Sequence, residues 1–260
     1  MSDTPWLLTD QPAPNVTRIT LNRPEQFNPL SRDMLSALQQ TLDAVAADRT
    51  CHVVLLAATG KAFSAGHDLR EMRSNPDEAF YRALFAQCSA MMLTIQRMPQ
   101  PVIALVQGIA TAAGCQLVAM CDLALATTHA RFAVSGINYG LFCSTPSVGV
   151  SRAMGRKQAM EMLLTGDFID ADQAQRRGLI NRVVDEQALD TEALALAQKI
   201  AAKPAVAVAM GKSLFYRQLE APIAQAYQDA EATMACNMMD ENAQEGFLAF
   251  LEKRQPQFNP

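Results

Sequence analysis

The sequence predicts an α/β protein with a helical C-terminal part. Short apolar runs alternate with segments of helical periodicity, which is typical of strands connected by helices. The run Val53 to Ala58 is apolar throughout, as expected for a parallel strand that is covered on both faces. From about Leu189 onward every segment has a helical pattern. We therefore predict a core over residues 1–195 and a helical region over residues 196–260.

The first half of the predicted core contains three strands and two long helices. A strand over Val16 to Leu21 ends at an Asn-Arg-Pro turn, and Ser31 then has the residue type that caps a helix. The apolar run from Val53 is the second strand. A helix over Ala79 to Met98 ends at two prolines, and Val102 to Val106 is the third strand. The first helix has an apolar face of Met34, Leu35, Leu38, Leu42 and Val45.

Six further elements complete the predicted core. Asp170 and Gln173 have the spacing of a capping pair, which predicts a helix start, and Gly178 favours the end of that helix. The six elements are short strands at 122–127, 131–134 and 179–184, and helices at 147–154, 157–164 and 170–178.

Composition excludes several classes of function. The chain has 260 residues, of which half are apolar and 18% are charged, as in ordinary globular proteins. A net charge of −4 with no basic tract argues against nucleic acid as a partner. The N-terminus resembles no secretion signal, and no apolar stretch reaches the roughly 18 residues that a membrane span needs. We therefore expect a cytoplasmic protein with no membrane partner.

The cysteines do not indicate a metal site. Six cysteines are scattered along the chain without a C-x-x-C pair, and only three histidines accompany them. Most are expected to be buried as small hydrophobic residues. We expect no structural metal centre.

Two turns rich in small residues are the main candidates for chemistry. The segment Ile103 to Asp122 runs from an apolar strand through Gly108 and an Ala/Gly-rich turn into a buried helix. The segment Gly60 to Leu69 turns through Gly60 and Gly66 after the preceding strand. Free backbone N–H groups at such turns can stabilise an oxygen that becomes negative during a reaction. Together the two turns predict one oxyanion hole, although Gly and Ala also permit close packing alone.

Five segments of the chain resemble the enoyl-CoA hydratase/isomerase, or crotonase, superfamily. The resemblance implies a spiral of ββα units with a helical C-terminal trimerisation region, in a homotrimer or hexamer. It also implies an acyl-CoA thioester as substrate, with CoA as part of that substrate and no permanently bound cofactor. Within the superfamily, Ala110 to Leu117 and Gly140 to Pro146 resemble the enoyl-CoA hydratase domain-containing branch. The five segments are LNRPEQFNPL (21–30), AFSAGHDL (62–69), MCD (120–122), AMEMLLTGDFIDADQAQRRGLINRVV (159–184) and FLAFLEKR (247–254).

The resemblance places the oxyanion hole at the backbone N–H groups of Ala65 and Ala113. There it would stabilise the enolate of a thioester, as expected of a lyase of this family. The positions of the family's two catalytic glutamates hold Gln116 and Gly136, and neither residue can act as a carboxylate. A positioned acid or base contributes about 10²–10⁴-fold. We therefore do not expect fast hydration of simple 2-enoyl-CoA esters.

Four polar side chains remain as candidates for chemistry, and a packing role is the alternative for each. His67 stands in a sequence similar to that of superfamily decarboxylases that act on malonyl-type CoA esters, where an imidazole could donate to a carboxylate or thioester oxygen. Gln116 could orient water. Cys143 and Ser144 lie in the loop that faces the acyl group in relatives and are candidate nucleophiles, although no neighbouring histidine activates them.

Four further residues are candidates for binding CoA. Their positions in the family suggest that Arg23 and Arg70 approach the nucleotide phosphates. Phe250 and Lys253 would reach the CoA of a neighbouring subunit. The alternatives are solvated surface charges and a packed aromatic ring. A non-catalytic acyl-CoA binding protein is the alternative to an enzyme, and it would bind the thioester without turnover.

Overall fold

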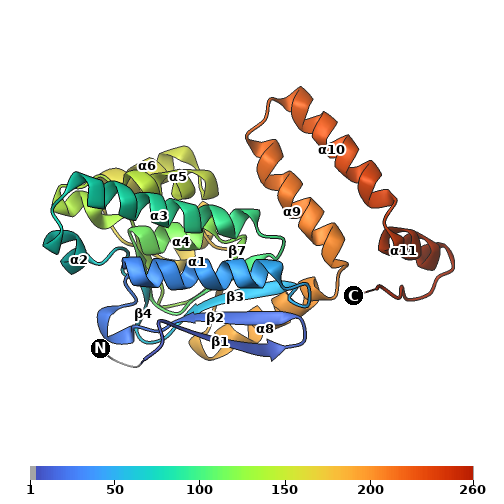
Figure 1. Cartoon of the computed structure of the whole chain (residues 1–260), viewed down its shortest axis with the longest axis horizontal. Coiled ribbons are helices and arrows are strands. Elements are labelled where there is room, and N and C mark those ends of the chain that lie inside the picture. The colour runs from blue at the N-terminus through green and yellow to red at the C-terminus, as the bar shows by residue number, and fades with distance from the viewer. Residues whose placement is uncertain (1–3, 260) are drawn as a thin grey trace.

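The computed structural model describes residues 4–259 and shows two β-sheets with helices around them (Figure 1). In the larger sheet the first two strands are antiparallel and all other neighbours are parallel. Its six strands are, in spatial order, β1 (Leu7–Ala13), β2 (Val16–Leu21), β3 (Val53–Ala58), β5 (Val102–Val106), β7 (Leu123–Thr127) and β10 (Arg182–Val184). The smaller sheet consists of β4 (Ala62–Ser64), β6 (Ile109–Thr111), β8 (Arg131–Ala133) and β9 (Ile169–Asp170).

Successive strands alternate between the two sheets. The strands β3, β5 and β7 lie in the larger sheet, and each is followed by one strand of the smaller sheet and then by helix. This repeat is the ββα unit expected from the sequence. Because β4, β6 and β8 are parallel neighbours, the turns that follow them lie at the same edge of the smaller sheet.

The larger sheet is covered on both faces, which explains the uninterrupted apolar run of β3. Val54 and Leu56 pack in the main core with α1 (Arg32–Ala47) and α3 (Glu78–Arg97), whereas Val53 and Leu55 pack against α8 (Leu189–Ala201) on the opposite face. The alternation follows from the two-residue period of a strand. The remaining core helices are α2 (Leu69–Ser74), α4 (Ala113–Met120), α5 (Ser144–Ala153), α6 (Arg156–Thr165) and α7 (Ala171–Arg177).

Two predicted helix caps are confirmed. The Ser31 hydroxyl accepts a hydrogen bond from the Met34 amide at the start of α1. The Asp170 carboxylate accepts one from the Gln173 amide at 2.7 Å, and α7 ends at Gly178, whose φ is +89°. Each cap satisfies an amide or carbonyl that the helix itself leaves without a partner.

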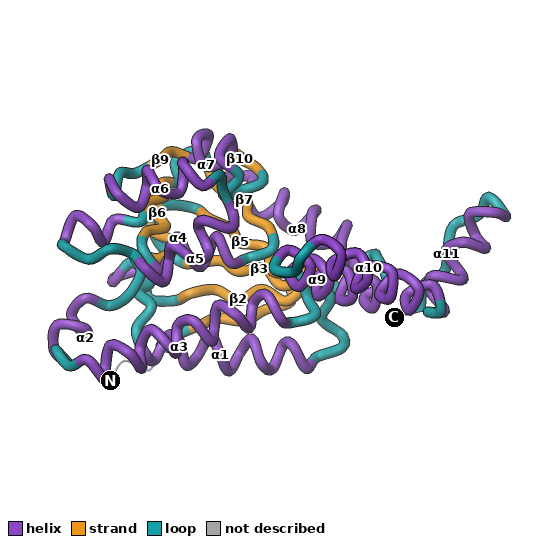
Figure 2. Tube along the Cα trace, turned by 90° about the horizontal axis from the view of Figure 1, so that it is seen from above, coloured by secondary structure: helices purple, strands orange, loops and turns teal. Residues whose placement is uncertain are grey.

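The C-terminal helices form an arm that leaves the core (Figure 2). The arm comprises α9 (Ala205–Leu219), α10 (Ile223–Met238) and α11 (Glu241–Leu251). The predicted boundary after residue 195 falls inside α8, which belongs to the core because it packs on the sheet; the chain leaves the sheet at the break before Pro204. Within residues 4–259 no single helix is long and apolar enough to cross a membrane, and α8 with α9 meets that test only as a pair bent by 102°.

Candidate active site

An apolar cavity of about 360 Å³ lies where the two small-residue turns meet. One wall comes from the turn after β4 and from α2, and a second comes from the turn between β6 and α4. The loop from Ser135 to Pro146 forms the third wall. None of the described residues that line this cavity is an aspartate, glutamate, lysine or arginine. The cavity is therefore suited to an uncharged chain such as an acyl group.

The two turns touch each other through glycines. A β-carbon built on Gly66, whose φ is +88°, would lie 3.0 Å from the Thr111 carbonyl oxygen and 3.1 Å from the Ala113 amide nitrogen. A β-carbon on Gly114 would lie 2.2 Å from the Ser64 carbonyl oxygen. Only glycine permits this approach at both positions. The backbone of one turn therefore lies directly against the first turn of α4.

The prediction that the Ala65 amide is a free donor is wrong. This amide donates a hydrogen bond of 2.9 Å to the Phe27 carbonyl. The neighbouring segment holds the turn through further bonds: the Ser64 hydroxyl donates to the Asn28 carbonyl, and the Leu30 amide donates to the Gly66 carbonyl. Because the turn is bonded to this segment, the Ala65 amide before Gly66 is not available to a ligand. The first amide beyond Gly66 is that of His67.

Two backbone amides at the cavity remain without a partner. Among residues 4–259, neither the His67 amide nor the Ala113 amide donates to any protein acceptor, and both residues line the cavity. Ala113 is the first residue of α4, where the helix provides no acceptor, and Ala112 before it has φ 50° and ψ −120°. The amide of Ala113 is thus free as predicted, whereas the free amide of the first turn belongs to His67 and not to Ala65.

The His67 side chain is held as a neutral imidazole. Its Nδ1 lies 3.0 Å from the Leu30 carbonyl oxygen, which can only accept, so Nδ1 carries the proton of this bond. Burial lowers the pKa of His67, and the Leu30 carbonyl opposes this only in part. In the neutral form Nε2 has a lone pair and no hydrogen, and within residues 4–259 it has no partner. This arrangement does not support donation from Nε2 to a substrate carboxylate.

Gln116 is buried and is not part of the cavity wall. Its Cγ lies 3.6 Å from the position of a β-carbon on Gly149 of α5, so its side chain extends toward that helix. Its Oε1 has no hydrogen-bond partner within the described residues. The predicted role of orienting water at the acyl group therefore lacks support from its position.

The candidate nucleophiles Cys143 and Ser144 lie at the cavity but lack a base. The Gly136 amide donates to the Cys143 sulfur at 3.3 Å, while burial raises the pKa of the Cys143 thiol. The Ser144 hydroxyl donates to the Phe142 carbonyl at 3.3 Å. No histidine or carboxylate of the described chain is hydrogen-bonded to either side chain. Neither residue has the activated arrangement that nucleophilic catalysis requires.

The cations predicted to bind CoA differ in their surroundings. The Arg23 guanidinium stacks on the Trp6 ring at 3.9 Å and donates to the carbonyls of Thr4, Pro5 and Asn22, so it fastens the N-terminal segment. Arg70 lies exposed on α2 beside the lining residue Leu69, and its guanidinium has no hydrogen bond within residues 4–259. Of the two, Arg70 has the guanidinium without a protein partner among the described residues.

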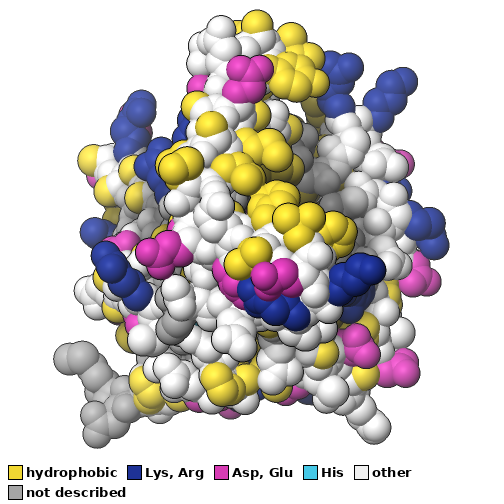
Figure 3. Space-filling model, turned by 90° about the vertical axis from the view of Figure 1, so that its right-hand side faces the viewer, with side chains coloured by type: hydrophobic (Ala, Val, Ile, Leu, Met, Phe, Trp, Pro, Cys, Tyr) yellow, Lys and Arg dark blue, Asp and Glu magenta, His cyan; other side chains and the backbone are white. Residues whose placement is uncertain are grey.

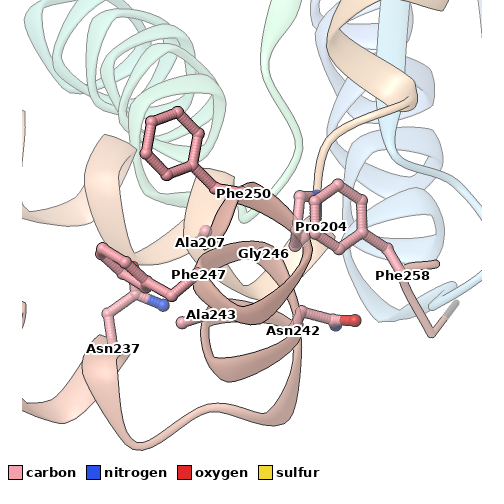
Figure 4. A pocket seen from close by; sticks show the side chains of 9 residues that line it. All are labelled: Pro204, Ala207, Asn237, Asn242, Ala243, Gly246, Phe247, Phe250 and Phe258. Carbon is pink, nitrogen blue, oxygen red and sulfur yellow. The ribbon is translucent and has the colours of Figure 1, made fainter. Parts of the chain in front are cut away.

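Phe250 and Lys253 lie at the opposite end of the molecule. They belong to α11 and the residues just after it, whereas the cavity lies beside α2 (Figure 2). Phe250 is 80% exposed and lines the pocket between α9 and α11, where Phe258 lies beside Gly246 (Figure 4). The two residues therefore do not reach the cavity of their own chain.

A buried ionic cluster that the sequence analysis missed fastens the arm to the core. The Asp122 carboxylate accepts from Lys212 Nζ at 2.7 Å, from the Tyr216 hydroxyl at 2.9 Å and from the Val102 amide at 2.7 Å. Lys212 Nζ also donates to two backbone carbonyls of the core. Burial lowers the pKa of Lys212, and Asp122 opposes that effect. The sequence of α9 is mostly apolar with a single lysine, and nothing in that pattern indicates this contact.

Two hydroxyl groups of the cavity wall were also missed. Thr111 at the end of β6 and Ser135 lie 2.9 Å apart through their side-chain oxygens. The sequence indicates the pair only through the position of Thr111, which lies directly before the second turn. Within residues 4–259 no group of three or more His, Cys, Asp or Glu residues is placed to hold a metal ion.

Comparisons with known proteins agree with this fold. Residues 12–260 match the model of the family described as enoyl-CoA hydratase/isomerase. The mitochondrial enoyl-CoA hydratase domain-containing protein 3 of Danio rerio is 44% identical over 249 residues, which are 96% of this chain and 86% of that protein.

Two solved structures are similar over almost their whole length. An enoyl-CoA hydratase of Mycobacterium smegmatis has a TM-score of 0.96 at 61% identity and covers 98% of this chain and 99% of its own. The human enoyl coenzyme A hydratase domain-containing protein 3 has a TM-score of 0.94 at 41% identity, with 98% and 100% covered. These similarities confirm the predicted crotonase fold and the resemblance to the domain-containing branch.

The expectation of a cytoplasmic protein is wrong by the same comparisons. The relatives named enoyl-CoA hydratase domain-containing protein 3 from Danio rerio, Rattus norvegicus and Homo sapiens are all named mitochondrial. Net charge and composition carry no information about the compartment. The family match spans the core and the arm alike. The chain belongs to the enoyl-CoA hydratase/isomerase family.

Proposed function

We propose that this protein is an acyl-CoA enzyme that stabilises the enolate of a thioester with the backbone amides of His67 and Ala113. The observation that carries the proposal is that these two amides come from separate turns, line one cavity and have no acceptor within residues 4–259. The contact between Gly66 and Ala113 supports their convergence. The substrate class follows from the family, whose relatives are named for enoyl-CoA.

The chemistry requires little beyond these donors. When the α-carbon of a thioester gains negative charge, most of that charge moves to the carbonyl oxygen. Two fixed amides stabilise it without reorganising, and one such donor contributes about 10²–10³-fold in comparable sites. The apolar wall strengthens the effect, because charge interactions are stronger where water is excluded. CoA would act as part of the substrate, with no cofactor held permanently.

The proposed reaction class is that of a lyase of this family that hydrates simple 2-enoyl-CoA esters slowly. Hydration needs groups that deliver and remove protons at the α- and β-carbons, and no described lining residue has a carboxylate. The neutral His67 and the buried thiol of Cys143 do not replace them. Loss of CO₂ from a malonyl-type ester would need only the two amides, because it creates the enolate by itself.

The assembly we propose is a homotrimer or hexamer built with the arm. The face in Figure 3 exposes hydrophobic side chains on the arm, and apolar residues of α10 and α11 are among the exposed ones. Phe250 and Lys253 would then contact CoA held by a neighbouring subunit. Arg70 is the cation of the same subunit best placed for its phosphates. The exposed apolar residues are Ile223, Tyr227, Met234, Met239, Phe247 and Leu251.

Exchange of α-hydrogens in D₂O tests the proposal. A panel of butyryl-CoA, crotonyl-CoA, 3-hydroxybutyryl-CoA and methylmalonyl-CoA is incubated with the protein, and mass spectrometry records deuterium uptake, hydration and CO₂ loss. We expect binding of the thioesters, with exchange or decarboxylation of at least one ester and slow hydration. Binding without any chemistry would favour the non-catalytic alternative. Absence of binding by well-folded protein would refute the proposal.

A further inference from the structure

The wall of the acyl cavity contains a pair of hydroxyl groups among apolar side chains. The Thr111 and Ser135 hydroxyl oxygens lie 2.9 Å apart, and both side chains are half-buried. Within residues 4–259 neither hydroxyl has a second partner. Their surroundings in the wall include Met72, Phe85 and Phe142, which offer no hydrogen bond.

This pair has hydrogen-bonding capacity that the protein does not use. Each hydroxyl has one hydrogen and two lone pairs, and the bond between them uses only one hydrogen and one lone pair. Both residues line the cavity, whose lining is otherwise mostly apolar, so the remaining hydrogen and lone pairs are available to a group bound there. Because an unpaired polar group costs free energy when water is displaced, a bound acyl chain must either satisfy the pair or leave it unpaired.

The pair lies close to the place where the thioester carbonyl would bind. Thr111 precedes Ala113 by two residues on the same turn, so their backbones lie at most about 7 Å apart. Ser135 approaches from the opposite wall through its bond to Thr111. A chain whose carbonyl oxygen accepts from the Ala113 amide therefore passes the pair within its first few carbon atoms.

We propose that the Thr111–Ser135 hydroxyl pair selects acyl groups that carry an oxygen substituent at C3. A 3-hydroxyl or 3-oxo group would take the hydrogen bonds that the pair offers, whereas a saturated chain would leave them unmade. The proposal rests on the proposed function, because the acyl chain enters this cavity only if the thioester binds there. It assigns a specificity role and no proton transfer, since hydroxyl groups are too weakly acidic to replace a carboxylate.

Affinity for two matched thioesters tests the selection. Calorimetry gives the Kd of butyryl-CoA and of 3-hydroxybutyryl-CoA for the wild type, Thr111→Val, Ser135→Ala and the double variant. We expect the wild type to bind the hydroxylated ester roughly 2- to 10-fold tighter, as for one or two neutral hydrogen bonds. The double variant should bind both equally. Thr145→Val is the matched control, because Thr145 lines the same cavity outside the pair and the preference should survive.

The affinities distinguish failure of the selection from failure of the proposed function. Equal affinity of the wild type for the two esters would overturn the selection, as would a preference that persists in the double variant. Failure of both esters to bind would refute the proposed function instead. If the double variant does not fold, Thr111→Ser and Thr111→Val serve the same purpose. The first keeps the hydroxyl and should keep more of the preference than the second, and equal loss in both would contradict the selection.

Discussion

Gly66 lies against Ala113, so that a β-carbon on Gly66 would stand 3.1 Å from the Ala113 amide nitrogen. This contact joins two turns that are separated by more than forty residues in the sequence. It also places the His67 amide, one residue beyond Gly66, beside the first free amide of α4. The proposed oxyanion hole depends on this contact.

Replacing Gly66 should disrupt enolate formation without unfolding the protein. In Gly66→Ala the new methyl group meets the Thr111 carbonyl and the Ala112 side chain at 3.0 Å, and φ is +88°. The two amides would move apart, and we expect α-hydrogen exchange of bound butyryl-CoA to fall about 10²-fold. Gly140→Ala is the matched control, because its φ is +80° but nothing lies within 4 Å of a new β-carbon. Equal losses in the two variants would show that backbone strain alone is responsible.

Gly136, at a position where the resemblance predicts a glutamate, has no room for a side chain. A β-carbon at this position would lie 2.6 Å from the Leu141 carbonyl oxygen and 2.8 Å from the Cys143 sulfur. We expect Gly136→Ala to lower the melting temperature, and Gln116→Glu with Gly136→Glu to leave crotonyl-CoA hydration slow. Calorimetry and a hydration assay measure the two effects. A gain in hydration of several orders of magnitude in the double variant would show that the loop adapts.

Protonation of His67 should destabilise the folded protein. Burial lowers the pKa of His67 below its ordinary value of 6.5, so the unfolded chain binds the proton more readily than the folded one. Stability from this group is complete above about pH 6.5 and is lost as the pH falls below that value. Urea unfolding between pH 5 and 8 should show a steeper loss in the wild type than in His67→Gln. Parallel curves would mean that His67 titrates alike in both states.

The ion pair of Lys212 with Asp122 should be essential for docking the arm. The two side chains are 6% and 12% exposed, and removal of the lysine in Lys212→Met leaves a buried carboxylate without its charge partner. We expect a loss of about 3–5 kcal/mol in the free energy of unfolding. Tyr216→Phe removes one hydrogen bond to the same charged carboxylate and should cost about 1.5–3 kcal/mol.

A second substitution separates charge from packing at this cluster. Lys212→Met combined with Asp122→Asn removes the uncompensated charge, so it should be less destabilised than Lys212→Met alone. Urea titrations at one protein concentration provide the comparison. If the double variant is the less stable of the two, the hydrogen bonds that the Asp122 carboxylate accepts from Val102 and Tyr216 outweigh the cost of its unpaired charge.

The strands and helices with a strong local pattern could be predicted from the sequence. The predicted strand over residues 16–21 and the buried face of α1 are confirmed in every named residue. In contrast β4, β6 and β9 have two or three residues each, which is too short for any periodicity to show. The strand β1 has a mostly exposed, polar sequence, and β10 begins at Arg182 instead of Leu179.

The sequence predicted which turns form the site but not which of their backbone amides are free. Gly66 and the Ala/Gly-rich turn indicated where free amides occur, yet the choice between the amides of Ala65 and His67 depends on a distant segment. Phe27 accepts from Ala65, and nothing local to the turn records this bond. The Lys212 contact with Asp122 spans ninety positions and likewise leaves no local pattern. Contacts of this kind follow from the tertiary fold alone.

Removal of a single N–H group tests the oxyanion hole most directly. Ala113→Pro deletes one proposed donor at the first position of α4, where the N–H has no acceptor within the helix. Glu78→Pro is the control, because Glu78 is the exposed first residue of α3 and lies outside the cavity wall. We expect α-hydrogen exchange of bound butyryl-CoA in D₂O to fall about 10²–10³-fold in Ala113→Pro and to remain unchanged in Glu78→Pro. Exchange at the wild-type rate in a folded Ala113→Pro protein would contradict the assignment of that amide.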